Sequence, residues 1–216
     1  MIYHSTKIRS LTKIPGSEAT VQEEEIRKFF TRFADLGIVT GETIVQDFSS
    51  AKTPVFVADH NEHEPWTRLL LIRRFGDVDR WLKITTHHGN VIIATAETAI
   101  RVYSPTELNV PDQPEPAIVD IYKARTFGEL ITGDRVRVTN TYRGAAGPDQ
   151  LSFDFDGDPD VPNQALVNRA VMFDPLTDIE MLTLGPTVGY EIVTESGCYF
   201  AGNVHLSLDI RVERSR

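Results

Sequence analysis

The sequence predicts a mainly β, antiparallel domain preceded by an N-terminal arm and one amphipathic helix. Beyond Gly37 the chain carries many short runs rich in β-branched and aromatic residues, and turn-forming residues separate them. No helical pattern alternates with these runs, which favours an antiparallel sandwich or barrel over a parallel α/β sheet. The runs include RLLLIRRF, RWLKITT, NVIIATA, AIVDIYKA, DRVRVTN and YEIVTE.

The length and composition are those of one globular domain. The chain has 216 residues, of which 41% are hydrophobic and 25% are charged, so it can bury a core of its own. Its 31 acidic and 22 basic side chains give a net charge of -9, which repels a phosphate backbone and anionic lipid. We therefore expect neither nucleic acid nor a membrane among its partners.

Cysteine usage and hydropathy indicate the compartment. Cys198 is the only cysteine, so the chain can form no internal disulfide and no cysteine-based zinc site. The first residues hold no unbroken apolar segment, and no apolar run reaches the roughly 18 residues of a membrane span. These features predict a cytoplasmic protein that is neither exported by a standard signal nor anchored in a membrane.

The N-terminal part is predicted to form the arm and the helix. Residues 1–20 are polar, and Pro15-Gly16 marks a turn. From Val21 to Leu36 apolar residues recur at helical spacing, with Glu23 to Glu25 in the first turn and Gly37 as the C-cap. The apolar residues should share one face, packed within the chain or against a partner. They are Ile26, Phe29, Phe30 and Phe33.

Three segments, in order along the chain, carry a resemblance to a known family. The first is Ile38-Val39-Thr40-Gly41-Glu42-Thr43-Ile44-Val45, which resembles the opening Cys-Val-Thr-Gly-Asp-Thr-Leu-Val pattern of inteins, members of the hedgehog/intein (Hint) superfamily. In this alignment Ile38 takes the place of the nucleophilic cysteine. An isoleucine side chain has no lone pair with which to attack the preceding carbonyl.

The second segment runs from Gly89 to Thr98 and resembles the hairpin that ends in Thr-x-x-His in the family. The family's histidine assists the acyl shift, and Thr98 takes its place here. A threonine hydroxyl does not titrate near neutral pH, so it cannot replace an imidazole as general acid or base. Thr95, the first threonine of the pattern, could still hydrogen-bond a backbone group.

The third segment runs from Gly189 to Val204 and resembles the last two strands of the family, with their phenylalanine-alanine-asparagine/glycine turn. The family pattern ends in a His-Asn pair, whose asparagine cyclises and releases the downstream segment. The straightest alignment places Ser207 and Leu208 at these two positions. A leucine cannot form a succinimide.

The resemblance implies a Hint-like β domain over residues 38–208, between the arm and helix of residues 1–37 and a C-terminal tail of residues 209–216. Its first and last strands would lie side by side, which would bring Val39 next to Val204. No catalytic residue is expected, because each catalytic position has lost its reactive group. The degenerate positions are Ile38, Thr95, Thr98, Ser207 and Leu208.

Two polar segments are candidate metal sites. His60 and His63 stand among carboxylates in Asp59 to Glu64, and such side chains can ligate zinc or another transition metal. The segment does not match the HExxH helix motif, and Pro65 follows at once, so a solvated loop is favoured.

The second polar segment gathers four carboxylates between Asp154 and Asp160, with Asp156 and Asp158 among them. They could surround calcium if the loop curls. The EF-hand pattern fails, because its sixth position is Pro159 and its twelfth is Ala165. An ordinary acidic loop is favoured, so we expect no cofactor, with calcium as the alternative.

These observations favour a non-catalytic structural or interaction module that docks into a larger assembly, such as a bacteriophage virion built in the cytoplasm. Its partners would be protein subunits, and the module would be oligomeric in that context. The arm and the Phe-rich helix supply the usual parts for docking. The alternative is an enzyme, either a residual autoprocessing domain with Thr40 or Thr43 as nucleophile or a metal-dependent activity at Asp59 to Glu64.

Overall fold

Antiparallel strands form almost the entire structure. The computed structural model describes residues 1–12, 20–40, 43–59, 66–108, 117–139 and 171–207. Within these residues, hydrogen bonds join 14 strands into one sheet. The strands are β1 (Ile2–Tyr3), β2 (Lys7–Thr12), β3 (Thr20–Glu25), β4 (Gly37–Thr40), β5 (Thr43–Asp47), β6 (Val55–Ala58), β7 (Trp66–Thr86), β8 (Val91–Ala94), β9 (Ala99–Leu108), β10 (Ala117–Thr126), β11 (Arg135–Thr139), β12 (Val171–Thr194), β13 (Cys198–Ala201) and β14 (Val204–Ser207). The helical elements are α1 (Ile26–Arg32) and the 3-10 turns η1 (Ala34–Leu36) and η2 (Phe127–Glu129). The predicted fold class, a mainly β antiparallel domain with one helix, is confirmed.

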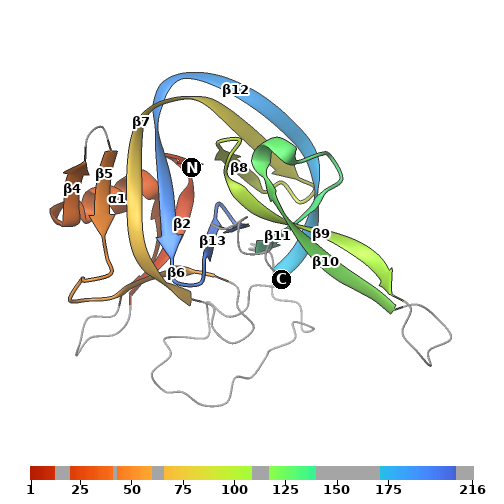
Figure 1. The fold of residues 1–216 in the computed structure, drawn as a ribbon, viewed down its shortest axis with the longest axis horizontal. Coiled ribbons are helices and arrows are strands. Elements are labelled where there is room, and N and C mark those ends of the chain that lie inside the picture. The colour runs from red at the N-terminus through yellow and green to blue at the C-terminus, as the bar shows by residue number, and fades with distance from the viewer. Residues whose placement is uncertain (13–19, 41–42, 60–65, 109–116, 140–170, 208–216) are drawn as a thin grey trace, which may run out of the picture.

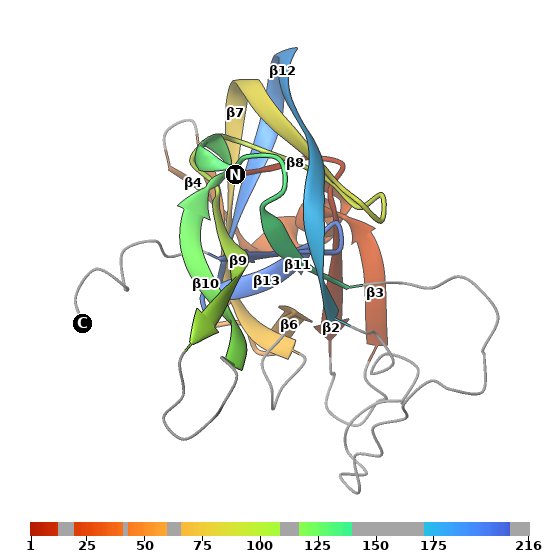
Figure 2. The same cartoon turned by 90° about the vertical axis from the view of Figure 1, so that its right-hand side faces the viewer.

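Two long strands form the spine of the molecule. β7 and β12 run antiparallel and arch over one side of it, as both views show (Figures 1 and 2). Breaks in their register bend the pair, including one between Thr183 and Thr187. Because the strands bend, one end of β7 pairs with β5 and β6 while its other end pairs with β8. The spine therefore joins two groups of shorter strands into a single fold.

The core lies between the curved layers and is filled by inward-facing residues of alternating strands. Along β11, for example, Val136 and Val138 are fully buried while Arg135 and Arg137 are partly exposed, the period-2 pattern of a strand with one covered face. The largest fully buried aliphatic side chains are Ile2, Ile8, Ile26, Leu69, Ile72, Ile84, Ile92 and Ile100.

The predicted N-terminal arm is wrong, because its described residues belong to the sheet. Ile2 pairs with Ala94 in β8 and with Tyr190 in β12. β2 pairs with β3, β6 and β13. The side chains of Ile2 and Ile8 are at most 1% exposed, so this segment is part of the core and does not extend from the domain as an arm. The sheet thus continues across the boundary that the sequence predicted at residue 38.

The predicted helix is shorter than expected. Residues 20–25 form β3, and α1 begins at Ile26. Two of the glutamates placed in the first helical turn, Glu23 and Glu25, instead lie opposite basic residues of β2, and Glu23 forms a salt bridge with Arg9. Cross-strand charge pairing of this kind stabilises a strand that the local sequence favours as helix. Gly37 ends the following 3-10 turn in an extended conformation rather than capping α1.

The aromatic face of α1 packs inside the chain. Ile26 and Phe29 are fully buried, Phe30 is 8% exposed, and Phe33 packs against the same core. The ring of Phe29 lies 4.9 Å from that of Phe33 and 6.0 Å from that of Phe48. The four residues therefore share one face, as predicted, and this face packs mainly against the chain's own core.

The final hairpin has the predicted form. β13 and β14 pair through Ala201 and Val204, and the two residues between them, Gly202 and Asn203, both have positive φ angles, 54° and 69°. This is the two-residue turn whose twist matches a β-hairpin, and glycine and asparagine are the residues that adopt it at least cost.

Candidate functional site

The turn between β8 and β9 carries the Thr-x-x-Thr pattern. Thr98 donates its backbone N–H to the carbonyl of Thr95 at 3.0 Å, which closes the turn. The two side-chain oxygens lie 3.2 Å apart, and both residues are buried, at 4% and 8% exposure. The fold thus brings both threonine hydroxyls to one buried point.

The first residue of the chain is bound at this turn. The Met1 nitrogen donates to Thr95 Oγ1 at 3.1 Å and to Thr98 Oγ1 at 2.7 Å. The Met1 carbonyl accepts from the Thr95 backbone N–H at 2.9 Å and from Thr98 Oγ1 at 2.9 Å. Because Ile2 is held in the sheet between β8 and β12, the backbone of residue 1 has a fixed position. Thr95 therefore does hydrogen-bond a backbone group, and that group belongs to Met1.

A cavity of about 370 Å³ adjoins Met1. The turn contributes Thr95, Ala96 and Glu97 to its lining, and the middle of β7 contributes Val78 to Leu82. Trp81 is fixed there by a 2.9 Å hydrogen bond from its indole nitrogen to Thr187 Oγ1. The site therefore combines a held backbone with open space beside it.

Ile38 does not reach this site. It lies in β4 at one end of the sheet, with β5 and β7 between it and β8, and it is 63% exposed. The structure thus separates Ile38, which the sequence alignment set at the nucleophile position, from the Thr95 to Thr98 turn, and Met1 is the residue that contacts this turn. Val39 lies in the same edge strand, whereas Val204 pairs with β11, so the predicted neighbourhood of Val39 and Val204 is wrong.

The opening pattern can be recognised at the start of the chain. Met1-Ile2-Tyr3-His4-Ser5-Thr6-Lys7-Ile8 has an apolar residue at its second and eighth positions and threonine at its sixth, as in Cys-Val-Thr-Gly-Asp-Thr-Leu-Val. The segment starting at Ile38 matched more letters, notably Thr-Gly, and so concealed it.

The end of β14 runs alongside the strand that follows the turn. Leu206 is in register with Ile100, two residues beyond Thr98. Ser207, at the position of the family's histidine, is 6% exposed and interacts with the buried thiol of Cys198 at 3.9 Å between oxygen and sulfur. Burial raises the pKa of that thiol, which keeps it protonated. Leu208 lies outside the described residues.

A buried histidine–carboxylate pair joins β14 to the residue that follows β6. His205 is 1% exposed and its Nε2 lies 2.8 Å from Asp59 Oδ1. Burial lowers the pKa of His205, even though the Asp59 carboxylate raises it. Sequence reasoning missed this pair, because Asp59 was considered only with its polar neighbours in the chain. Its partner is 146 residues away.

The candidate metal ligands are outside the described residues. This holds for His60 and His63 and for Asp154, Asp156 and Asp158, so their roles stay predictions. Within the part of the chain that the structure describes, no group of three histidine, cysteine or acidic side chains could hold a metal ion.

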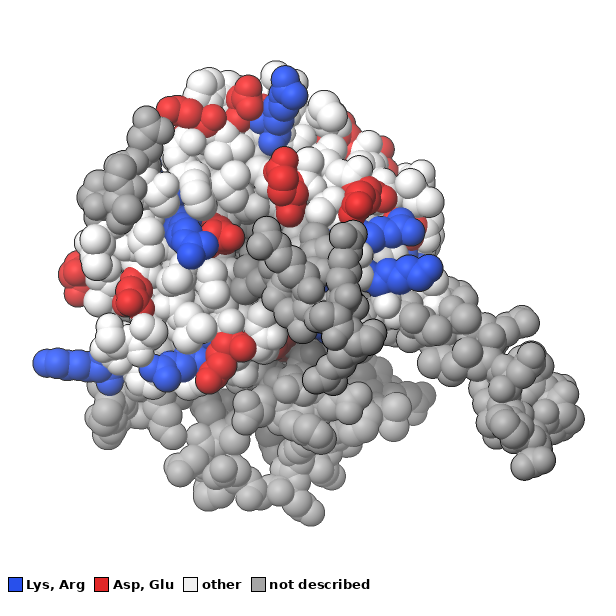
Figure 3. Space-filling model, viewed as in Figure 1, with Lys and Arg blue, Asp and Glu red and all other residues white. Residues whose placement is uncertain are grey.

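The described surface carries charges of both signs. On the face shown in Figure 3, lysine and arginine side chains alternate with aspartate and glutamate, without an extended basic area of the kind that follows a phosphate backbone. Among the described residues, no helix has the length and apolarity that crossing a bilayer would require.

Both buried bases make the fold sensitive to acid. Burial lowers the pKa of the Met1 amino group from the usual 8.0 to about 6, against the opposing effect of Glu191 and Glu97, and it lowers the pKa of His205 below 6.5. The unfolded chain therefore binds protons that the folded chain rejects, so stability is full above the unfolded pKa values and falls as the pH drops toward the folded ones.

For a chain with a free Met1 amine, we expect the free energy of unfolding to fall by about 2 kcal/mol between pH 8 and pH 6 from this amine alone. Urea unfolding at intervals across that range measures it. The His205→Gln variant should retain the slope above pH 6.5 and lose part of the slope below it. A stability that is flat from pH 8 to pH 6 would show that the Met1 nitrogen is not buried.

Solved inteins share this architecture along nearly the whole chain. An intein from a hyperthermophile superposes with a TM-score of 0.60 at 11% identity, covering 95% of this chain and 98% of the intein. The PabCDC21-1 intein has a TM-score of 0.60 at 9% identity, covering 95% of this chain and 96% of the intein. The Pab PolII intein has a TM-score of 0.59 at 12% identity, covering 97% of this chain and 100% of the intein. No family model and no curated protein matches the sequence.

The chain therefore has an all-β fold of the Hint class. More particularly, it is similar to inteins from end to end. The extent of the match also agrees with the site geometry, because a domain starting at residue 38 would omit 37 of 216 residues and could not reach 95% coverage.

Proposed function

We propose that the chain is a Hint-like module that no longer cleaves itself and that serves as a structural or interaction component of a larger assembly. The observation that carries the proposal is the contact of Met1 with Thr95 and Thr98. In this proposal Met1 stands at the position of the family's nucleophile and Thr98 at the position of its histidine, and neither residue has the required chemistry.

Three groups are needed for the family's reaction, and each is replaced. Met1 supplies a thioether where a thiol must attack the preceding carbonyl. Thr98 supplies a hydroxyl that holds both the nitrogen and the carbonyl of residue 1 but does not exchange protons at neutral pH. Ser207 and Leu208 supply neither an imidazole nor an amide that can cyclise. The site therefore still hydrogen-bonds the backbone of residue 1, but it has no group that can cleave a peptide bond there.

What remains is a rigid scaffold whose partners, in this proposal, are protein subunits. A multi-subunit particle assembled in the cytoplasm, such as a bacteriophage virion, is a setting that suits such a module. Fold and function are separable in this way because chemistry resides in the site rather than in the architecture.

The purified chain should keep its full mass during several days at neutral pH with added thiol. Intact-mass spectrometry measures this directly, and a parallel sample in denaturant controls for contaminating protease. A fragment that begins or ends near Ser207, formed at a rate independent of protein concentration, would contradict the proposal and indicate self-cleavage.

The alternative of residual autoprocessing at Thr40 or Thr43 has less support. These two residues pair with each other in the β4–β5 hairpin, at the end of the sheet away from the Thr95 to Thr98 turn. A metal-dependent activity at Asp59 to Glu64 falls largely outside the described residues, and the carboxylate of Asp59 is already in contact with His205.

A further inference from the structure

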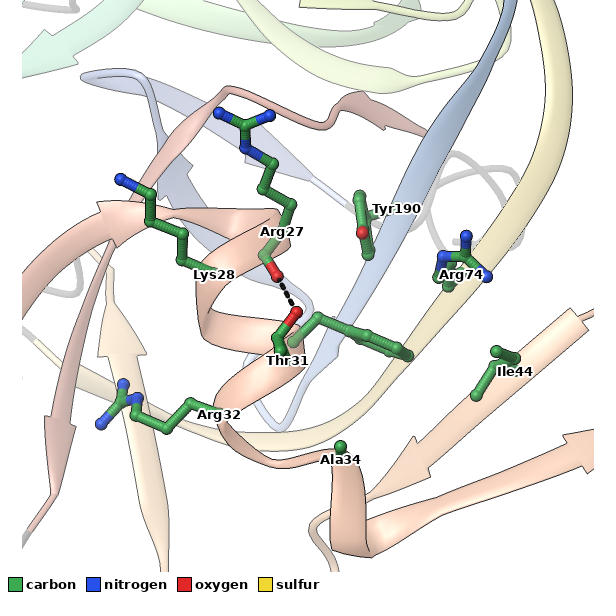
Figure 4. A pocket seen from close by; sticks show the side chains of 9 residues that line it. Arg27, Lys28, Thr31, Arg32, Ala34, Ile44, Arg74 and Tyr190 are labelled. Carbon is green, nitrogen blue, oxygen red and sulfur yellow. Dashed lines mark hydrogen bonds between the residues drawn. The ribbon is translucent and has the colours of Figure 1, made fainter.

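A groove of about 710 Å³ lies between α1 and the neighbouring strands (Figure 4). α1 contributes Arg27, Phe30 and Thr31, whose spacing of three and four residues places them on one face, and Ala34 at the start of η1 extends this wall. The Thr31 hydroxyl donates a hydrogen bond of 2.9 Å to the backbone carbonyl of Arg27. This small side chain therefore lies in the middle of the helix wall. This face is distinct from the aromatic face that packs against the core, although Phe30 contributes to both.

The opposite wall is one row of residues across three strands. Arg74 of β7 is in register with Ile44 of β5 on one side and with Tyr190 of β12 on the other. Residues in register on adjacent strands point to the same face of a sheet. The floor is apolar, because the rings of Phe30 and Tyr190 lie 5.4 Å apart and both residues are buried.

The rim of the groove is cationic. Arg27 stands above the floor on the helix side and Arg74 on the strand side (Figure 4), and no aspartate or glutamate lines the groove. Arg27 is paired with Glu25, whereas Arg74 hydrogen-bonds the Tyr190 side chain. Among the described residues, no carboxylate pairs with Arg74 or with the nearby Lys28.

The next position along β7 and β12 shows an arginine that does have a carboxylate partner. Arg73 and Glu191 are also in register, one position away and hence on the opposite face, and they form a salt bridge of 2.7 Å. Arg73 therefore has its carboxylate within the chain. Among the described residues Arg74 has no such partner, although the chain as a whole carries a net charge of -9. Arg74 is therefore the cation of this groove that we expect an acidic ligand to contact.

We propose that this groove binds an acidic peptide segment of a partner chain, with one apolar side chain seated over Phe30 and Tyr190 and carboxylates facing Arg27 and Arg74. The proposal rests on the function as an assembly module proposed above, and it names the chemistry of the partner. An apolar anchor supplies affinity by burial, and the flanking ion pairs supply specificity.

Binding of labelled peptides to the full chain tests the proposal. The probe is a fluorescein-labelled octapeptide, Asp-Asp-Phe-Asp-Asp-Leu-Asp-Asp, followed by fluorescence polarisation. We expect saturable binding that weakens at least about tenfold in the Arg27→Gln, Arg74→Gln double variant and weakens with added salt. The Arg73→Gln variant, which removes the same charge from the opposite face, should bind within about twofold of wild type.

Two altered peptides test the same contacts with the wild-type chain, so the result does not depend on the folding of a variant. Asparagine in place of every aspartate removes the charge, and alanine in place of phenylalanine and leucine removes the anchor; each change should abolish binding. Equal losses in the Arg73 and Arg74 variants, or no binding of the original probe, would overturn the proposal. So would dimerisation that depends on Arg27 and Arg74 without peptide binding, which would indicate a second copy as the occupant. Each of these results leaves the mass test of self-cleavage unaffected.

Discussion

Replacing Phe29 with alanine should lower the free energy of unfolding by about 3–5 kcal/mol, a large part of the stability of a domain of this size. The side chain is fully buried against Phe33 and Phe48, so its removal leaves a cavity that neighbouring strands cannot fill. Urea unfolding followed by tryptophan fluorescence measures the change.

Ile38→Ala is the matched control for this experiment. Ile38 is another large apolar side chain near the same helix in sequence, but it is 63% exposed, so its loss should change stability by no more than about 0.5 kcal/mol. If the Phe29 variant kept wild-type stability while Ile38→Ala unfolded, the assignment of these residues to core and edge would be reversed.

Restoring the missing chemistry at residue 1 should produce cleavage. In a fusion with a reporter protein placed before residue 1, we expect Met1→Cys with Thr98→His to release the reporter when thiol is added. The cysteine thiol attacks the preceding carbonyl and the C–N bond breaks, while the histidine protonates the departing nitrogen, which Thr98 already contacts at 2.7 Å. The reporter is then joined to the cysteine as a thioester, and the added thiol displaces the cysteine sulfur and releases the reporter. A positioned general acid contributes about 10²–10⁴ in rate, so Met1→Cys alone should be slower by about that factor.

The controls separate position from reactivity. Ile38→Cys with Thr98→His in the same fusion carries the same two side chains but places the thiol at the sheet edge, so the chain should stay intact. Electrophoresis and mass spectrometry of the released reporter locate the cut. Cleavage before residue 38 in this control, with none before residue 1, would restore the alignment that the structure contradicts.

Local pattern predicted much of the fold. Alternation in segments such as Arg135–Thr139 identifies strands because a half-covered sheet imposes a period of two. The Gly202-Asn203 turn is likewise predictable, since few residues adopt the positive φ that it needs. Thr95 and Thr98 also form a local unit, because a single turn between β8 and β9 brings their hydroxyls together.

The remainder depends on contacts that local sequence does not encode. β1 has only two residues, and its place is fixed by β8 and β12, about 90 and 190 residues away. β3 reads as the start of a helix until Arg9 and the rest of β2 are placed beside it. The His205–Asp59 pair and the arginine-lined groove are likewise assembled from distant segments. The segment at Ile38 matches the family's opening motif in sequence. The contact of Met1 with Thr95 and Thr98, in contrast, follows only from the pairing of β1 with β8 and β12.

The most direct test of the central claim, that residue 1 occupies the degenerate Hint site, is a nuclear Overhauser measurement on the threonine methyl groups. We expect cross-peaks from the Thr95 and Thr98 side chains to Met1 and none to Ile38. Cross-peaks from Thr98 to Ile38, with Met1 free of contacts to either threonine, would contradict it.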